Sequence, residues 1–241
     1  FWLIVFVFVN LTSILYLGAL TIQSVMGIPL LYGVIGLALF AVVYSINGGL
    51  KAVALTDVIQ VFFLVGGGLI TTYIALDLLG AGEGVLKGCE TLYLKTEDKF
   101  HLILDPSHPG YMDLPGLSVI LGGLWVANLY YWGCNQYIIQ RALAAKNIKE
   151  AQWGMAFAGV IKLLIPLLVV IPGIAAFALD APLSKPDEAY PWLLGNLLPV
   201  GVKGIAFAAL TAAIVSSLAS MMNSISTIFT MDIYQVYIRP E

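Results

Sequence analysis

The first fifty residues contain no aspartate, glutamate, lysine or arginine, and Lys51 is the first charged residue of the chain. A water-soluble domain carries roughly 25% charged residues, whereas charged residues make up 10% of these 241 residues and hydrophobic residues 60%. This composition excludes a soluble globular enzyme, a disordered regulator and a nucleic-acid-binding protein, the last of which needs many lysine and arginine side chains for phosphate contacts. We expect an all-α polytopic membrane protein.

Six apolar segments are long enough to cross a bilayer, which takes about 20 mostly apolar residues per helix. Turn residues separate the first three segments, at Gly27 and Pro29 and again at residues 47–49. The six expected spans run over residues 1–23, 29–47, 56–79, 117–140, 151–179 and 200–237. The last is too long for one perpendicular crossing, so we expect it to tilt or to extend beyond the membrane.

Lysine and arginine in short connectors indicate the orientation of a membrane protein, because they accumulate on the cytoplasmic side. The connector after the fourth expected span carries Arg141, Lys146 and Lys149. Alternation of the spans puts Lys51 and Arg239 on the same side. We therefore expect all five to be cytoplasmic.

The loop over residues 80–115 then lies outside, and it contains Cys89, His101 and His108. The second cysteine, Cys134, falls in an expected span. The different settings of the two cysteines predict neither a disulfide nor a zinc site, and the histidines lack metal-ligand spacing.

Lys162 lies about one third of the way along the fifth expected span. A lysine at the centre of a membrane helix costs roughly 2.5–3.5 kcal/mol on insertion scales. It indicates either a polar internal cavity that uses the ammonium group or a side chain that extends to the cytoplasmic interface. The residues alone favour the cavity and leave the interface open.

The fourth expected span combines glycine, amide and aromatic residues: Gly122, Gly123, Asn128, Tyr131 and Trp132. Glycine pairs and amides inside a membrane helix predict a break or an unwound turn that lines a cavity. The amide of Asn128 both donates and accepts hydrogen bonds, which suits a hydroxyl-rich ligand, and the aromatic rings offer flat faces to sugar C–H groups. An aromatic belt at the membrane interface is the alternative for the rings, but a belt does not explain the amide or the glycines.

The sixth expected span is rich in hydroxyl groups. Ala213, Ser216 and Ser217 have helical i, i+3, i+4 spacing, so the Ala213 carbonyl and the two hydroxyls could offer three oxygens to a small hard cation such as sodium. The alternative is close helix packing, with serine hydroxyls bonded to their own backbone.

Asp57 opens the third expected span at its cytoplasmic end, with Gln60 about one turn later. The carboxylate either interacts favourably with the positive end of the helix dipole and so stabilises the helix, or attracts sodium ions that leave toward the cytoplasm. Both interpretations stay open.

Four parts of the chain together resemble the sodium/solute symporter family. They are residues 122–141 (GGLWVANLYYWGCNQYIIQR), Lys162, residues 56–60 (TDVIQ) and residues 213–217 (AIVSS). Within the family the resemblance is greatest to the bacterial branch that couples sodium to galactose uptake, and it runs through essentially the whole chain.

The resemblance implies a LeuT-type inverted-repeat transporter core, of which this chain is a fragment of about six transmembrane helices. Core helices three to five would occupy about residues 1–79, an external loop residues 80–115, and core helices six to eight about residues 116–237. The chain would then be an internal part of one transmembrane domain. Helices missing at both ends would be needed to complete its binding sites.

The resemblance also implies roles for the polar and aromatic residues at membrane depth. Asn128 and Lys162 would hydrogen-bond to sugar hydroxyls. Tyr131 would cover the sugar from the cytoplasmic side, with Trp132 beside it in the same inner gate.

For sodium, the resemblance implies that Ala213, Ser216 and Ser217 are ligands and that Asp57 lies near the exit path. Family members that couple two sodium ions tend to have threonine where this chain has Ala219. One sodium ion per sugar is therefore expected.

These expectations describe a secondary active transporter, not an enzyme, that spans the inner cell membrane several times and couples inward sodium flow to hexose uptake by alternating access. Its expected partners are a sugar, sodium and the lipid bilayer, with no nucleic acid. Alternatives are a symporter of the same family for proline, pantothenate, iodide or sialic acid, and a sugar sensor or channel on the same scaffold.

Overall fold

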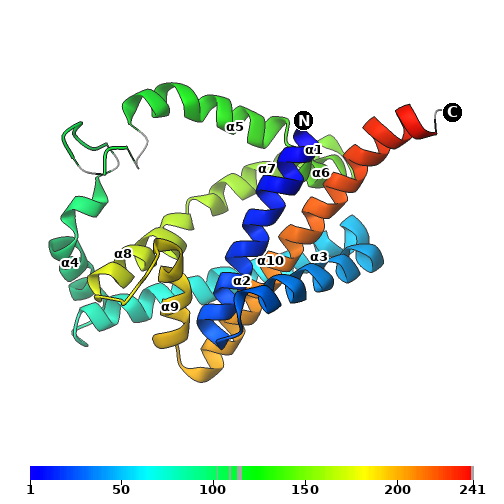
Figure 1. Ribbon diagram of the computed structural model, residues 1–241. Helices are drawn as coiled ribbons and strands as arrows, with labels where there is room; N and C mark the ends of the chain where they lie inside the picture. Colours follow the sequence, from blue (N-terminus) through cyan, green and yellow to red (C-terminus); the bar gives the residue numbers. More distant parts are fainter. Residues whose placement is uncertain (102, 109, 113–115, 240–241) are drawn as a thin grey trace. The chain divides into compact units, whose positions relative to one another are not determined.

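The computed structural model describes residues 1–101, 103–108, 110–112 and 116–239, and within these ranges it contains helices and no strands (Figure 1). Four helical stretches in the described part are long and apolar enough to cross a membrane: Leu3–Met26, Val53–Leu79, Ile148–Ala178 and Val200–Ile238. A shorter apolar helix covers Leu30–Ile46. The first, third, fifth and sixth expected spans are thus confirmed by length and composition.

The chain divides into two compact units. The first unit contains Phe1–Ala75 and Leu164–Glu241, and the second contains Leu76–Leu163. Each unit is described separately below.

The first unit begins with one continuous helical stretch, made of α1 (Trp2–Val5), the π-helical η1 (Phe6–Leu11) and α2 (Thr12–Met26). The stretch ends where Gly27 adopts a left-handed conformation with φ of 71°, and the Gly27 N–H bonds to the Gln23 carbonyl at 2.8 Å. Glycine is favoured at this position because it has no Cβ to clash. The turn expected at Gly27 is confirmed.

The long helix α3 (Leu30–Leu79) consists of two helical halves joined at a kink. Gly49 alone leaves the helical conformation there, with φ of 57° and ψ of −169°. The expected boundary between the second and third spans is therefore confirmed, because this backbone conformation is essentially restricted to glycine.

We expect Gly49→Ala to lower the free energy of unfolding by roughly 1–3 kcal/mol, because a Cβ at this φ and ψ is strained. Open space surrounds the position, so the cost comes from the backbone and not from a neighbouring side chain. Thermal unfolding of the purified protein in detergent measures the effect. Gly36→Ala is the matched control, since Gly36 lies in the same helix with equally open space and no positive φ. Equal stability of the two variants would contradict the strained kink.

The helix α10 (Val200–Ile228) continues without interruption into the π-helical η6 (Phe229–Ile238). It lies beside α2 (Figure 1). The contact of α10 with α2 and the first half of α3 is made by five buried apolar side chains: Ala19, Leu37, Ala41, Val215 and Leu218. Gly18 permits this close approach, because a Cβ there would lie 2.7 Å from Cγ2 of Ile214. The middle of the sixth span is therefore anchored in the first unit.

The remaining elements of the first unit follow the second unit in the chain. They are η4 (Pro166–Val170), α8 (Ile171–Ala178), η5 (Pro186–Glu188) and α9 (Ala189–Asn196). A second apolar cluster, made of Leu194, Leu198 and Ala206, joins the end of α9 to the start of α10. These contacts hold the turn that leads into α10.

The second unit begins with the last residues of α3, 76–79, and its described residues form six further helical elements. They are α4 (Val85–Lys95), η2 (Glu97–Phe100), η3 (Val119–Gly123), α5 (Leu124–Gly133), α6 (Gln136–Leu143) and α7 (Ile148–Lys162). Gly88 fits against the end of α3, since a Cβ on it would lie 1.8 Å from the Leu76 carbonyl oxygen. Glycine is thus required where α4 packs on the residues that precede it.

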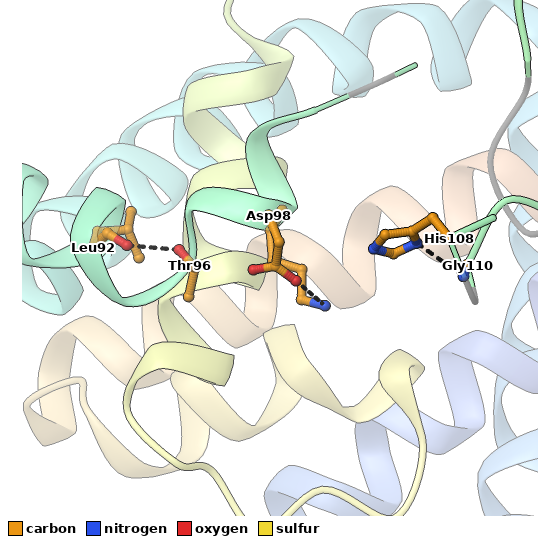
Figure 2. A network of polar contacts seen from close by, with 6 residues as sticks. Leu92, Thr96, Asp98, His108 and Gly110 are labelled. Carbon is orange, nitrogen blue, oxygen red and sulfur yellow. Dashed lines mark hydrogen bonds and ion pairs between the residues drawn. The ribbon is translucent and has the colours of Figure 1, made fainter. Parts of the chain in front are cut away.

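The loop after α4 is held by short-range polar contacts (Figure 2). The Thr96 hydroxyl donates to the Leu92 carbonyl at 2.6 Å, and Gly110 N–H donates to Nδ1 of His108 at 3.0 Å. Lys99 lies 3.0 Å from a carboxylate oxygen of Asp98 and lowers the pKa of that carboxyl through this contact. His108 therefore organises a local turn of the backbone.

The fourth expected span, residues 117–140, is not one continuous helix. Its helix ends at Gly133, Cys134 leaves the helical conformation, and the extended Asn135 caps α6 by accepting from Tyr137 N–H at 3.1 Å. Gly122 and Gly123 lie in the π-helical η3 without interrupting the stretch. The break predicted for this span is present, but it follows the aromatic run and does not occur at the glycine pair.

Candidate functional site

Lys162, Tyr131 and Trp132 meet in the second unit, although α7 carries the lysine and α5 carries the two rings. Nζ of Lys162 lies 4.5 Å from the centroid of the Trp132 ring and 5.7 Å from that of Tyr131. The two rings are 5.1 Å apart and nearly perpendicular, at 83°. We call these three side chains the aromatic–lysine cluster.

The position of Lys162 at the end of α7 favours this arrangement. Lys162 is the last residue of α7, where the negative end of the helix dipole stabilises a cation. The ring faces of Trp132 and Tyr131 add a cation–π attraction of about 0.5–2 kcal/mol. Within the second unit, the ammonium is therefore directed at aromatic faces.

The cluster can bind a polar ligand with apolar faces. An ammonium group has three hydrogen-bond donors and no acceptor, so it can donate to ligand hydroxyl or carboxylate oxygens. The half-exposed Tyr131 ring and the Trp132 ring supply flat apolar surfaces next to it. This pairing of donors with ring faces matches the chemistry of a hexose.

Asn128 lies one helical turn before the two rings on α5, at the i, i+3 and i+4 spacing that places residues on one helix face. Its side chain is exposed, and Nδ2 donates to the carbonyl of Leu124 in the same helix at 2.8 Å. The structure therefore places Asn128 on the face of the cluster, with its amide hydrogen-bonded to its own helix.

A cavity of about 350 Å³ adjoins the cluster in the second unit. It lies among α5, α6 and α7, and its lining includes Trp132, Arg141 and Glu150. The guanidinium of Arg141 also lies 5.9 Å from the centroid of the Tyr137 ring. Sequence reasoning used Arg141 only for orientation and missed this cavity. The i, i+9 spacing from Trp132 across the helix break gave no signal that the residues meet.

In the first unit, Ser216 on α10 donates a hydrogen bond from Oγ to Oδ1 of Asp57 on α3. Ser216 is 3% exposed and Asp57 is partly buried. A carboxylate at membrane depth needs such donors, because an uncompensated charge there is costly. Two residues far apart in the sequence, both expected to serve sodium, are thus in direct contact.

Ala213 and Ser217 line a groove of about 320 Å³ together with Thr21 from α2 and Leu64 from α3. Ser216 points elsewhere, toward Asp57, because adjacent residues on an α-helix differ in direction by about 100°. The structure thus places two of the three expected sodium ligands at one groove. The third, Ser216, does not line this groove and contacts the acid instead.

A polar contact that sequence reasoning missed lies further along α10. The Ser45 hydroxyl, on the first half of α3, donates to Oδ1 of Asn223 at 3.3 Å. Ser220 and Ser224, which share the same side of α10, are fully buried. The repeated four-residue spacing of Ser216, Ser220 and Ser224 is the sequence signal that could have indicated this buried polar face.

Comparison with known proteins shows what this chain resembles. The family model described as the sodium:solute symporter family matches residues 1–241. A sodium/glucose cotransporter of Vibrio parahaemolyticus is 56% identical, across 100% of this chain and 47% of the relative. Sodium/glucose cotransporter 4 of Danio rerio is 36% identical, across 99% of this chain and 40% of the relative.

One solved structure shows the same fold. It is the substrate-bound outward-open state of a Na⁺-coupled sialic acid symporter, with a TM-score of 0.79 and 23% sequence identity. The match covers 96% of this chain and 48% of that chain. The all-helical, LeuT-type fold expected from the sequence is therefore confirmed. The chain spans about half the length of the relatives it matches.

Proposed function

The chain belongs to the sodium:solute symporter family, and from this premise we propose that its full-length protein couples inward sodium flow to the uptake of a hexose such as galactose or glucose. The coupling proceeds by alternating access. The family consists of sodium-coupled carriers, so the function is transport through a multi-pass membrane protein and not enzymatic catalysis. The inner cell membrane is the proposed location.

The aromatic–lysine cluster is the observation that carries the sugar assignment. The ammonium of Lys162 lies 4.5 Å from the Trp132 ring centroid, so a sugar hydroxyl can accept from Nζ while its C–H face rests on a ring. Tyr131 would close this position from the cytoplasmic side. Asn128 would exchange its bond to Leu124 for a bond to a sugar hydroxyl.

The contact between Ser216 and Asp57 supports the sodium assignment. Because Ser216 donates its hydrogen to the carboxylate, the lone pairs of its oxygen remain available to a cation. The carbonyl of Ala213 and the hydroxyl of Ser217 would be the other two oxygen ligands from this chain, and Asp57 would attract the ion as it leaves. Helices outside these 241 residues would supply the rest of both sites.

We expect Ser217→Ala in the full-length protein to raise the sodium concentration for half-maximal uptake by about tenfold, because one oxygen ligand is lost. The maximal rate of uptake at saturating sodium should change less. Ser226→Ala is the matched control, since Ser226 is an exposed serine on the same helix. Normal sodium activation of the Ser217 variant would contradict its role as a ligand.

A substrate panel tests the function as a whole. Uptake of labelled galactose, glucose, myo-inositol, proline, pantothenate, iodide and sialic acid is measured in proteoliposomes with and without sodium. We expect sodium-dependent uptake of a neutral hexose. Lys162 also suits an anionic solute. Sodium-dependent uptake of sialic acid without hexose uptake would contradict the proposed hexose substrate but would still support sodium symport.

A further inference from the structure

The segment that leads through η4 into α8 departs from the α-helical hydrogen-bonding pattern. In the π-helical η4, the Ile171 N–H bonds to the carbonyl of Pro166, five residues earlier, and not to that of Leu167. The next donor in a π pattern for the Leu167 carbonyl would be residue 172, which is a proline without an N–H. The backbone of its own helix therefore leaves the Leu167 carbonyl in need of another donor.

Thr72 of α3 supplies this donor. Its hydroxyl lies 2.6 Å from the Leu167 oxygen and 2.9 Å from the Gly68 oxygen in its own helix. The shorter contact is the one between helices. Thr72 is 7% exposed and Leu168 is 8% exposed, so the protein and not bulk solvent surrounds the bond.

Gly68 brings the two segments close enough for this bond. A Cβ at Gly68 would lie 3.0 Å from Cδ2 and 3.4 Å from Cβ of Leu168. Gly68 and Thr72 are one turn apart on α3 and therefore face the same side. The glycine thus permits the close approach, and the threonine satisfies the carbonyl that this approach brings into reach.

We propose that Thr72 is a positioning residue that, together with Pro172, fixes the packing of the segment made of η4 and α8 against the second half of α3. This role in transport rests on the function proposed above. The same half of α3 carries Asp57, so this interhelical hydrogen bond holds the helix of the sodium-side acid to the segment made of η4 and α8 within the first unit. A shift of either helix must break this bond or move both helices together.

The proposal makes Thr72 and Pro172 energetically coupled. Thr72→Val keeps the shape of the side chain but leaves the Leu167 carbonyl without its donor, which is unfavourable in an apolar environment. Pro172→Ala restores a backbone N–H next to that carbonyl. Thr72→Val should then matter much less in the Pro172→Ala background, whereas independent sites would give additive effects.

The experiment is a double-mutant cycle on the full-length protein, made of Thr72→Val, Pro172→Ala and their combination. Thr72→Ser is the conservative variant, and Thr227→Val is the control, because the Thr227 hydroxyl bonds within its own helix, to the Asn223 carbonyl. The melting temperature in detergent reports the bond itself. The KM and maximal rate of sodium-driven galactose uptake report positioning.

We expect Thr72→Val to lower the ratio of maximal rate to KM by about fivefold and the melting temperature by about 2–4 °C. Thr72→Ser and Thr227→Val should stay close to the wild type. In the Pro172→Ala background, Thr72→Val should change either quantity by less than half as much.

Two results would overturn the proposal: equal effects of Thr72→Val in both backgrounds, or a lower melting temperature with unchanged uptake, which would reduce Thr72 to a structural residue. If the wild type shows no sodium-driven hexose uptake, the proposed function fails. The melting-temperature cycle then still decides whether Thr72 and Pro172 are coupled, and the solute identified by the panel replaces galactose in the uptake assay.

Discussion

Lys162→Met is expected to raise the KM for sugar in sodium-driven uptake by about 10–100-fold, because hydrogen bonds from a charged donor contribute about 1.5–3 kcal/mol. Methionine keeps an unbranched stem of similar length beside the Trp132 and Tyr131 rings, so the packing is largely retained. The ammonium that lies 4.5 Å from the Trp132 centroid is lost. Initial uptake rates over a range of galactose concentrations measure the effect.

Two further substitutions separate the effect of the lost Lys162 charge from an unspecific effect of substitution on the protein. Lys149→Met removes an exposed lysine from the first turn of the same helix, and we expect wild-type kinetics. Lys162→Arg keeps the charge and the attraction to the rings but changes the donor geometry, so an intermediate KM is expected. An unchanged KM for sugar in Lys162→Met would contradict the assignment of the aromatic–lysine cluster to the sugar site.

Asp57→Asn is expected to raise the sodium concentration for half-maximal uptake by about tenfold or more, since the attraction of a nearby carboxylate for the cation is lost. Asparagine can still accept the hydrogen bond from Ser216 through Oδ1, so the contact between α3 and α10 is kept. Sodium activation curves at saturating sugar measure this change.

A double-mutant cycle with Ser216→Ala shows whether the two residues act as a unit. We expect Ser216→Ala to have a smaller effect in the Asp57→Asn background than in the wild type, because both changes disturb one charge-assisted contact, while the loss of the Ser216 ligand oxygen still weakens sodium activation. Val58 follows the acid and has an exposed side chain, so Val58→Ala serves as the neighbouring control. Sodium activation that is unchanged in Asp57→Asn would contradict a role for the carboxylate in the sodium path.

Local features of the fold were predictable because single residues determine them. Gly27 and Gly49 mark chain turns, and both adopt positive φ in the structure. The long apolar runs predicted the helices at residues 3–26 and 200–238 for a different reason, since a continuous apolar segment has few alternatives to a helix in a membrane. In these places the local sequence and the fold agree.

Contacts between distant segments were less predictable. The sequence indicated Asp57 and Ser216 separately but gave no sign that they touch, because no local pattern encodes which face of α10 meets α3. The helix break at Cys134 and Asn135 was displaced from the glycine pair, where glycine is tolerated within a π-helical turn. The bond from Thr72 to Leu167 depends on a π turn and a proline that only matter once the two helices lie together.

The most direct test of sodium-coupled sugar transport is the accumulation ratio of labelled galactose in proteoliposomes that contain the full-length protein. One charge that crosses 100 mV supplies about 2.3 kcal/mol, and a tenfold sodium gradient adds about 1.4 kcal/mol. Together these sum to about 3.7 kcal/mol, which can sustain a sugar gradient of up to several hundred-fold. We predict accumulation far above the external concentration, and its collapse when a sodium ionophore dissipates the gradient. Equal internal and external galactose at every sodium gradient would contradict coupled transport.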